Sequence, residues 1–283
     1  SIFGLPRFEQ VSFQARFPFG TIALKEEGFP LTAEIKGWSP FVPTEADHSS
    51  LPAGALEYRF KNNSSQTVDS VFSFHSKNFM KPNESDLEKI GKNFIQGINR
   101  GFILSQAGTT SQPHNGGDFA IFTDAAETVV DHCWFRGGWF DPLTITWESI
   151  RKGEVKKVDP VESGAPGASL YVPFKLGPGE EKTIRVMMVW YVPLSDLRHG
   201  GDATEDEKCD PASGCCGTSA ELGMTVSDAD YTSGKYKPWY SNRFKNIQEV
   251  ATFWETNYDS LHQKSALFRD TFYSSTLPPE VIE

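Results

Sequence analysis

The chain has 283 residues, a formal net charge of −10 at pH 7 and a pI near 5.2. This acidic balance argues against a nucleic-acid partner and an anionic membrane surface, because both need a basic face on the protein. No apolar run approaches the roughly 20 residues that a membrane-spanning helix needs. The chain contains 22 Phe, 8 Tyr and 7 Trp but only 4 Met, and aromatic side chains suit the pleated surface of a sheet. We therefore expect a soluble globular protein with one large β domain or two small ones.

The N-terminal segment carries a long strand signal. Residues 11–19 alternate apolar and polar side chains, as a half-buried strand does. We expect a kink or bulge at Gly20, before the pattern continues at Ile22 and Leu24.

Two further strands flank a stiff connection. Residues 31–36 and 56–61 show the same two-residue period. Between them, Pro40, Pro43 and Pro52 each fix their own φ and push the preceding residue toward extended geometry. This pattern predicts two antiparallel strands joined by an ordered excursion.

The middle of the chain contains several short strand signals. Residues 68–75 follow a polar turn at 62–66. Residues 100–105, 118–123 and 127–131 are separated by Gly, Pro, Asn and Asp, which favours further short strands.

A short helix and a hairpin come next. Asp141 followed by Pro142 is typical of a helix N-terminus, and Gly153 stands where a glycine ends a helix. Residues 169–176 and 184–192 alternate on either side of a Gly-Pro-Gly turn, which predicts a β-hairpin.

The last part of the chain changes its period. Residues 193–237 form a long loop rich in Gly, Asp, Ser and Cys. Apolar residues then recur three, four or seven apart, which predicts one amphipathic helix over about 242–268. The predicted fold is mainly β: a two-sheet antiparallel β-sandwich over 1–238, with a short internal helix, and one long C-terminal helix within 239–283.

Short segments spread over most of the chain carry a family resemblance. They are Ser-Pro-Phe-Val-Pro at 39–43, Ser-Ser-Leu-Pro at 49–52, Lys-Asn-Asn at 61–63, Leu-Gly-Pro-Gly-Glu at 176–180, Val-Trp-Tyr-Val-Pro at 189–193, Tyr-Ser-Asn-Arg-Phe at 240–244 and Thr-Leu-Pro-Pro at 276–279. In order and spacing they resemble the N-terminal domain of glycoside hydrolase family 116, the non-lysosomal glucosylceramidase and bile-acid β-glucosidase type.

The resemblance implies a retaining β-glycosidase that acts on β-glucosides without a cofactor. In that family a glutamate nucleophile and an aspartate acid lie on an (α/α)6 barrel that follows the N-terminal domain. Neither residue can be assigned to a position here, and we expect the barrel to lie beyond Glu283, after the start of a linker. The chain alone is therefore expected to be an inactive accessory scaffold that packs on the catalytic domain and shapes the rim of its active site. The alternative is a free-standing carbohydrate-binding module.

One loop has the side chains of a sugar-binding surface. Trp134 and Trp139 offer apolar faces, while Arg136 and Asp141 offer hydrogen-bonding groups, around a Gly137-Gly138 hinge. In the simpler alternative, Asp141 caps a helix, the tryptophans pack at the sandwich edge and Arg136 pairs with a carboxylate.

The cysteines leave three possibilities open. Cys209, Cys215 and Cys216 lie close together in the long loop with His199 upstream, and Cys133 stands alone. The cluster suits a metal site or a disulfide, although adjacent cysteines fit structural zinc spacing poorly. Free thiols in a reducing compartment are the third possibility, so the compartment stays open, with export to the periplasm or the outside of the cell as one option.

Overall fold

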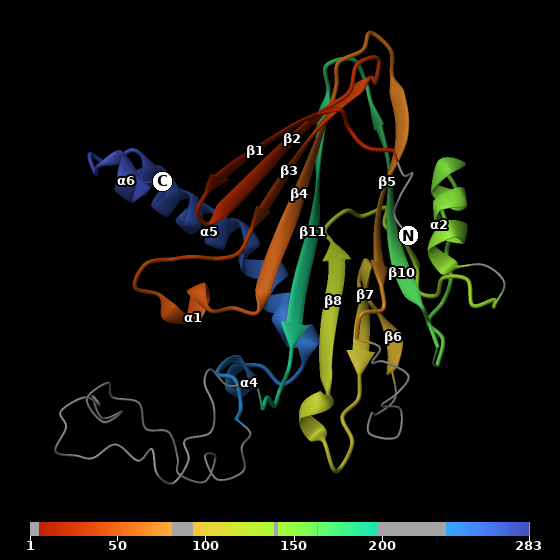
Figure 1. The fold of residues 1–283 in the computed structure, drawn as a ribbon, viewed down its shortest axis with the longest axis vertical. Helices are drawn as coiled ribbons and strands as arrows, with labels where there is room; N and C mark the ends of the chain where they lie inside the picture. The colour runs from red at the N-terminus through yellow and green to blue at the C-terminus, as the bar shows by residue number, and fades with distance from the viewer. Residues whose placement is uncertain (1–5, 81–92, 139–140, 163, 197–235, 283) are drawn as a thin grey trace.

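The computed structural model describes residues 6–80, 93–138, 141–162, 164–196 and 236–282 (Figure 1). The strands form two antiparallel sheets. The large sheet has eight strands in the order β1 (Gln10–Arg16), β2 (Phe19–Lys25), β3 (Leu31–Trp38), β4 (Ala53–Asn62), β11 (Glu181–Tyr191), β8 (Gly117–Thr123), β7 (Gly101–Gln106) and β6 (Asn93–Ile98). The small sheet has the order β5 (Val68–Lys77), β10 (Gly167–Leu176) and β9 (Val129–Asp131). The helices are α1 (Ala46–Ser49), the 3-10 turn η2 (Pro113–Asn115), α2 (Pro142–Arg151), α4 (Tyr240–Arg243), α5 (Ile247–Tyr273) and α6 (Pro279–Ile282).

The inner core lies between the two sheets. Leu170, Val172 and Phe174 alternate along β10 and face the large sheet, where Ile184 and Val186 of β11 lie in the same buried cluster. Full burial of a side chain of this size stabilises the fold by roughly 1.5–3 kcal/mol. The two-residue period seen in the sequence therefore marks which face of each strand enters the sandwich.

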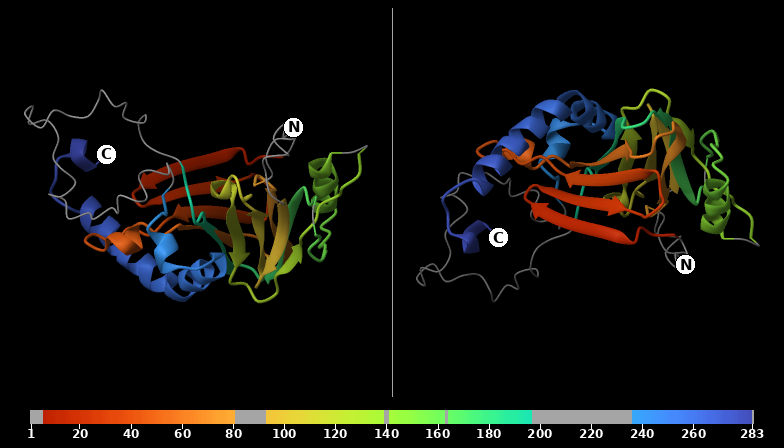
Figure 2. Two further views of the ribbon diagram at one scale, coloured as in Figure 1. Left: turned by 90° about the horizontal axis from the view of Figure 1, so that it is seen from below. Right: turned by 90° about the horizontal axis from the view of Figure 1, so that it is seen from above.

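A second core lies on the other face of the large sheet, beneath α5. Ile247, Val250, Trp254, Tyr258 and Leu261 recur at helical spacing and are buried in one cluster with residues of the sheet. Figure 2 shows α5 along one side of the strands and α2 at the opposite side of the molecule, beyond the small sheet. The sandwich is thus a layered structure in which α5 covers part of the outer face of the large sheet.

A chain of hydrogen bonds connects α5 to this face. Nε1 of Trp38 donates to the hydroxyl of Tyr258 at 3.0 Å, and that hydroxyl donates to Oε1 of Glu57 at 2.9 Å. Burial raises the pKa of Tyr258, so its hydroxyl keeps the proton that it donates. Both the polar contacts and the apolar burial therefore fix the position of α5 on the sheet.

The structure confirms the predicted class of a mainly β, two-sheet antiparallel sandwich with a long C-terminal helix. Strands β3 and β4 pair directly, as the flanked proline connection predicted. The predicted single helix over 242–268 is divided, because Phe244 has extended backbone angles between α4 and α5. Asn246 then caps α5 by accepting a hydrogen bond from the backbone N–H of Glu249 at 3.0 Å.

The prediction of one long N-terminal strand is wrong. The chain reverses between Arg16 and Phe19, which are register partners, so β1 and β2 form a hairpin. Pro18 lies in this reversal, and proline has no N–H to donate to a strand ladder. The reversal is hidden in the sequence because the apolar alternation continues through the turn.

The predicted hairpin of 169–176 with 184–192 is also wrong. Strand β10 pairs with β5 and β9 in the small sheet, whereas β11 pairs with β4 and β8 in the large sheet. The turn at 177–180 therefore carries the chain from one sheet to the other. Both strands direct apolar side chains into the core between the sheets. Those of β10 pack toward the large sheet, and those of β11 pack toward the small sheet. Strand β6 was not predicted, because residues 93–98 lie in a stretch without clear periodicity.

Candidate functional site

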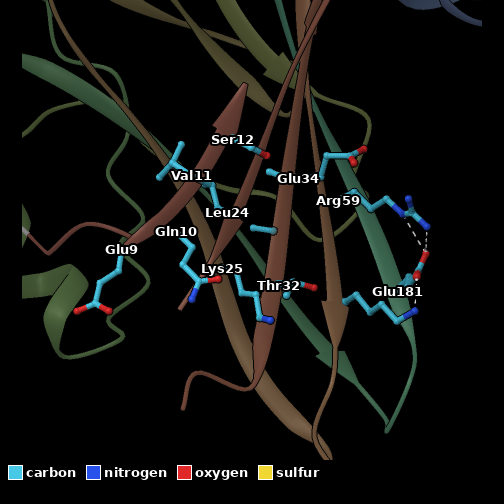
Figure 3. A pocket seen from close by; sticks show the side chains of 13 residues that line it. Glu9, Gln10, Val11, Ser12, Leu24, Lys25, Thr32, Glu34, Arg59 and Glu181 are labelled. Atoms are coloured by element: carbon cyan, nitrogen blue, oxygen red, sulfur yellow. Dashed lines mark hydrogen bonds and ion pairs between the residues drawn. The ribbon is translucent and has the colours of Figure 1, made fainter. Parts of the chain in front are cut away.

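At strands β1, β2 and β3, near one edge of the large sheet, the two faces of the sheet differ in chemistry. One face carries a hollow of about 750 Å³ (Figure 3). Thr32 and Glu34 line it from β3, on the face to which Trp38 also belongs, because successive side chains of a strand point to opposite faces. We call this the charged hollow. Its lining residues are Glu9, Gln10, Val11, Ser12, Ala23, Leu24, Lys25, Thr32, Ala33, Glu34, Arg59, Lys61 and Glu181.

The charges on β4 in this hollow are paired. Nε of Arg59 donates to Oε2 of Glu181 at 3.0 Å, and Nζ of Lys61 lies 3.3 Å from Oε1 of the same carboxylate. The hydrogen bond from Arg59 and the ammonium of Lys61 hold the pKa of Glu181 below its usual range. Two cations share one anion at this solvated position, so the hollow resembles a charged sheet surface more than a catalytic pair.

The opposite face of these strands is apolar, and in the part of the chain that the structure describes two of its side chains are largely exposed. Val11 is 59% exposed and Phe13 is 68% exposed. Ile22, Leu24 and Ile35 lie half-buried beside them, because Phe13 pairs with Ile22 and Val11 with Leu24. We call these five residues the open apolar face. It continues the core side of the sandwich outward along the sheet, since Ile35 pairs with Tyr58, which packs against the core.

The predicted sugar-binding loop is divided between buried and exposed positions. The ring of Trp134 is only 5% exposed, and its Nε1 donates to Oγ of Ser169 at 2.7 Å. A Cβ added at Gly167 would lie 2.6 Å from this ring, so the indole fills the space against the outer face of the small sheet. Arg136 is exposed, and Trp139 lies outside the described residues. The buried indole agrees with the packing alternative for Trp134.

Asp141 caps α2, which confirms the alternative expectation for this residue. Its carboxylate accepts from the backbone N–H of Leu143 at 2.9 Å and from Oγ1 of Thr144 at 2.5 Å. These hydrogen bonds, that of Thr144 first, lower the pKa of Asp141. A sugar-binding role for the four predicted residues stays a prediction.

A half-buried histidine that was not predicted as a site residue lies behind Trp134. Nδ1 of His75 is 2.7 Å from Oγ of Ser169, and Nε2 is 2.8 Å from Oγ of Ser73. Burial lowers the pKa of His75 to about 4, so the imidazole is neutral at pH 7. Ser169 is fully buried, so we interpret this serine-histidine contact as a packing element of the small sheet.

The predicted cysteine cluster of the long loop lies outside the described residues, with Cys209, Cys215, Cys216 and His199. A disulfide or metal cross-link there stays a prediction, which thiol counting with and without reductant tests. Cys133 is half-buried, and burial raises the pKa of its thiol, so little thiolate forms at neutral pH. Within the described ranges, no three His, Cys, Asp or Glu side chains cluster closely enough to hold a metal ion. No helix among these residues has the length and apolar character to cross a membrane.

A comparison with models of known protein families finds one match. The family model described as "beta-glucosidase 2, glycosyl-hydrolase family 116 N-term" matches residues 4–261. A solved structure named as a candidate kojibiose phosphorylase from the human microbiome aligns with a TM-score of 0.44 and 10% identity. The alignment covers 94% of this chain but 26% of the other, so this chain spans about a quarter of that protein. No curated protein sequence matches the chain.

Proposed function

The chain belongs to the family of N-terminal domains of glycosyl-hydrolase family 116, and from this membership we propose that it is an accessory scaffold domain. In this proposal it is part of a retaining β-glycosidase of the β-glucosidase or glucosylceramidase type. It packs on a following (α/α)6 catalytic domain and shapes the rim of the active site. Residues 1–238 supply the sandwich, and residues 239–283 supply the C-terminal helix and the start of the linker.

The open apolar face is the observation that carries this proposal. Exposed apolar side chains that lie side by side, unlike single scattered ones, are typical of interaction surfaces in soluble proteins. A partner that covers Val11 and Phe13 gains roughly 25 cal/mol for each Å² of apolar surface removed from water. The catalytic domain of the same protein is the occupant that family membership supports. Docked there, it would extend the sandwich core along β3, β2 and the edge strand β1.

The test is a charge placed on this face in the intact parent glycosidase. We expect Phe13→Asp to make the domain junction sensitive to proteolysis and to lower kcat/KM for an aryl β-glucoside. Phe135→Asp is the matched control, because Phe135 is 42% exposed in the loop that precedes α2. Proteolysis and activity that are the same in both variants would overturn the docking role.

The alternative function is a carbohydrate-binding module, and the predicted loop is its motivation. A module should bind oligosaccharides in calorimetric titration of the isolated chain, with affinity that depends on Trp134 or Trp139. The burial of Trp134 supports the scaffold over this alternative, because a buried indole has no face to offer a sugar. Binding that is lost in Trp139→Ala would favour the module.

A further inference from the structure

A second hollow, of about 440 Å³, lies at one end of β6, β7 and β8, away from the open apolar face. Its volume falls in the range of small-molecule sites, roughly 300–1,000 Å³. We call it the loop hollow, because the segment 107–116 that joins β7 to β8 forms part of its wall. The side chains that give it its chemistry are Phe94, Gln96, Ser105, Gln106, Asp118 and Tyr191.

The strand register brings the polar groups together. Ser105 of β7 pairs with Phe94 on one side and with Asp118 on the other, so the three side chains share one face. Nε2 of Gln96 donates to Oγ of Ser105 at 3.0 Å, and Oγ of Ser105 donates to Oδ1 of Asp118 at 2.6 Å. Ser105 is itself 1% exposed, so the carboxylate is held by a fixed and buried donor.

The carboxylate of Asp118 retains hydrogen-bonding capacity. Among the described residues, only Ser105 hydrogen-bonds to it, and an ionised carboxylate accepts several hydrogen bonds. Burial raises the pKa of Asp118, with the hydrogen bond from Ser105 acting against this rise. A partly desolvated carboxylate of this kind is suited to accept a hydrogen bond from a ligand hydroxyl.

The loop wall is closely packed. A Cβ added at Gly108 would lie 2.6 Å from the carbonyl oxygen of Pro113, and one added at Gly116 would lie 2.9 Å from the nitrogen of Gly108. Only glycine permits this close approach of the two ends of the loop. The hollow is therefore formed by the packed backbone without a ligand.

The described lining favours a neutral ligand. The described residues that line the hollow include no lysine or arginine, so these residues offer no counter-charge to a phosphate or carboxylate ligand. A single carboxylate with amide and hydroxyl neighbours instead offers both donors and acceptors. Phe94 and Tyr191 add aromatic side chains beside these polar groups. Paired donors and acceptors next to aromatic carbon match the alternating hydroxyls and C–H groups of a sugar.

We propose that the loop hollow binds a sugar unit of a neutral carbohydrate, with Asp118 accepting from a hydroxyl and Gln96 completing the contact. This site is separate from the loop around Trp134, and it does not depend on the docking of a catalytic domain. It places a carbohydrate contact on the same sheet face as α5, because Tyr191, which pairs with Asp118, lies in the α5 core.

The experiment is a titration of chain 1–283 with methyl β-glucoside and cellobiose, followed by amide chemical shifts in NMR. We expect shifts that cluster at β6, β7, the segment 107–116 and the start of β8. Asp118→Asn keeps an acceptor for Ser105, so the fold is retained, but it removes the charge and should weaken binding about tenfold. Gln96→Ala provides a second variant with the same expected direction.

Asp124→Asn is the matched control, because Asp124 directly follows β8 and pairs with Arg185 at 3.4 Å outside the hollow. It should bind sugar as the unchanged chain does. Shifts that map to the loop around Trp134, equal affinity in Asp118→Asn, or no shifts with either sugar would overturn the proposal. Ethanolamine is the probe for a cationic ligand, and tighter binding of ethanolamine than of either sugar would overturn it as well.

Discussion

Asn62 shows how much a single buried side chain organises. It is fully buried where β4 ends, and its Nδ2 donates to the carbonyls of Gln66, Leu176 and Gly177 at 2.7, 3.0 and 3.1 Å. Its Oδ1 accepts from the backbone N–H of Ser64 at 2.9 Å. One amide thus joins two of the crossings between the sheets, from β4 to β5 and from β10 to β11.

Replacement of Asn62 by alanine should be strongly destabilising. Asn62→Ala leaves several carbonyls without a donor, and we expect a loss of about 3 kcal/mol in the free energy of unfolding. Urea denaturation followed by tryptophan fluorescence measures this loss. Asn63→Ala is the control. Among the described residues, the side-chain amide of Asn63 hydrogen-bonds to Thr32 alone, at the exposed surface, so this variant should change stability by less than about 0.5 kcal/mol. Equal effects of the two variants would contradict this account of Asn62.

His75 should make stability depend on acid pH. Its pKa is about 4 in the folded chain, against about 6.5 when unfolded. The unfolded state therefore takes up a proton first, so stability is fully present above pH 6.5 and is lost as the pH falls toward 4. The loss attributable to this residue reaches about 3 kcal/mol.

The measurement for His75 compares unfolding free energies between pH 7 and pH 4. His75→Gln retains hydrogen-bonding groups for both serines but does not titrate, so its stability should fall less steeply over this range. His48→Gln, at a half-exposed histidine on α1, controls for the loss of one imidazole. A parallel fall in His75→Gln and the unchanged chain would show that another group is responsible.

At the scale of elements, α5 depends on a few aromatic contacts. Trp254 is 0% exposed, and its ring centroid lies 5.1 Å from those of Trp38 and Tyr258. Trp254→Ala removes the centre of this cluster and should lower the free energy of unfolding by about 4 kcal/mol. Leu267 lies on the same helix and is 68% exposed. Leu267→Ala is therefore the control, and it should lower the free energy of unfolding by less than about 0.5 kcal/mol. Thermal denaturation followed by circular dichroism compares them, and similar midpoints would show that α5 is not part of the folded core.

For the whole molecule, we expect no glycosidase activity from chain 1–283 alone. Hydrolysis needs two carboxyl groups placed around one glycosidic bond, and in the proposed function that pair belongs to a separate catalytic domain. In the charged hollow, Glu181 is already paired with two cations. Elsewhere in the chain, the carboxylate of Asp141 caps α2. An aryl β-glucoside assay is the measurement, with the parent glycosidase as positive control. Cleavage by chain 1–283 that Asp141→Asn or Asp118→Asn abolishes would contradict the accessory role.

Local patterns in the sequence were sufficient for several features of this protein. The two-residue period identified β3, β4 and β5, and the change to helical spacing identified α5, because each signal is contained within a few neighbouring residues. The Asp141-Pro142 pair identified the start of α2 for the same reason. The segments that resemble the glycoside hydrolase family also lie in the sequence itself, which is why the family could be predicted before the fold was known.

Strand pairing and burial were decided only by the tertiary structure. Alternation along a strand states which residues share a face but not which sheet the strand joins, so β10 and β11 could not be assigned to different layers. The same limit hid the burial of Trp134, since an aromatic residue in a glycine-rich loop suits exposure and packing equally well. Gln96, Ser105 and Asp118 belong to three different strands, and only the register of the folded sheet brings their side chains into one hollow.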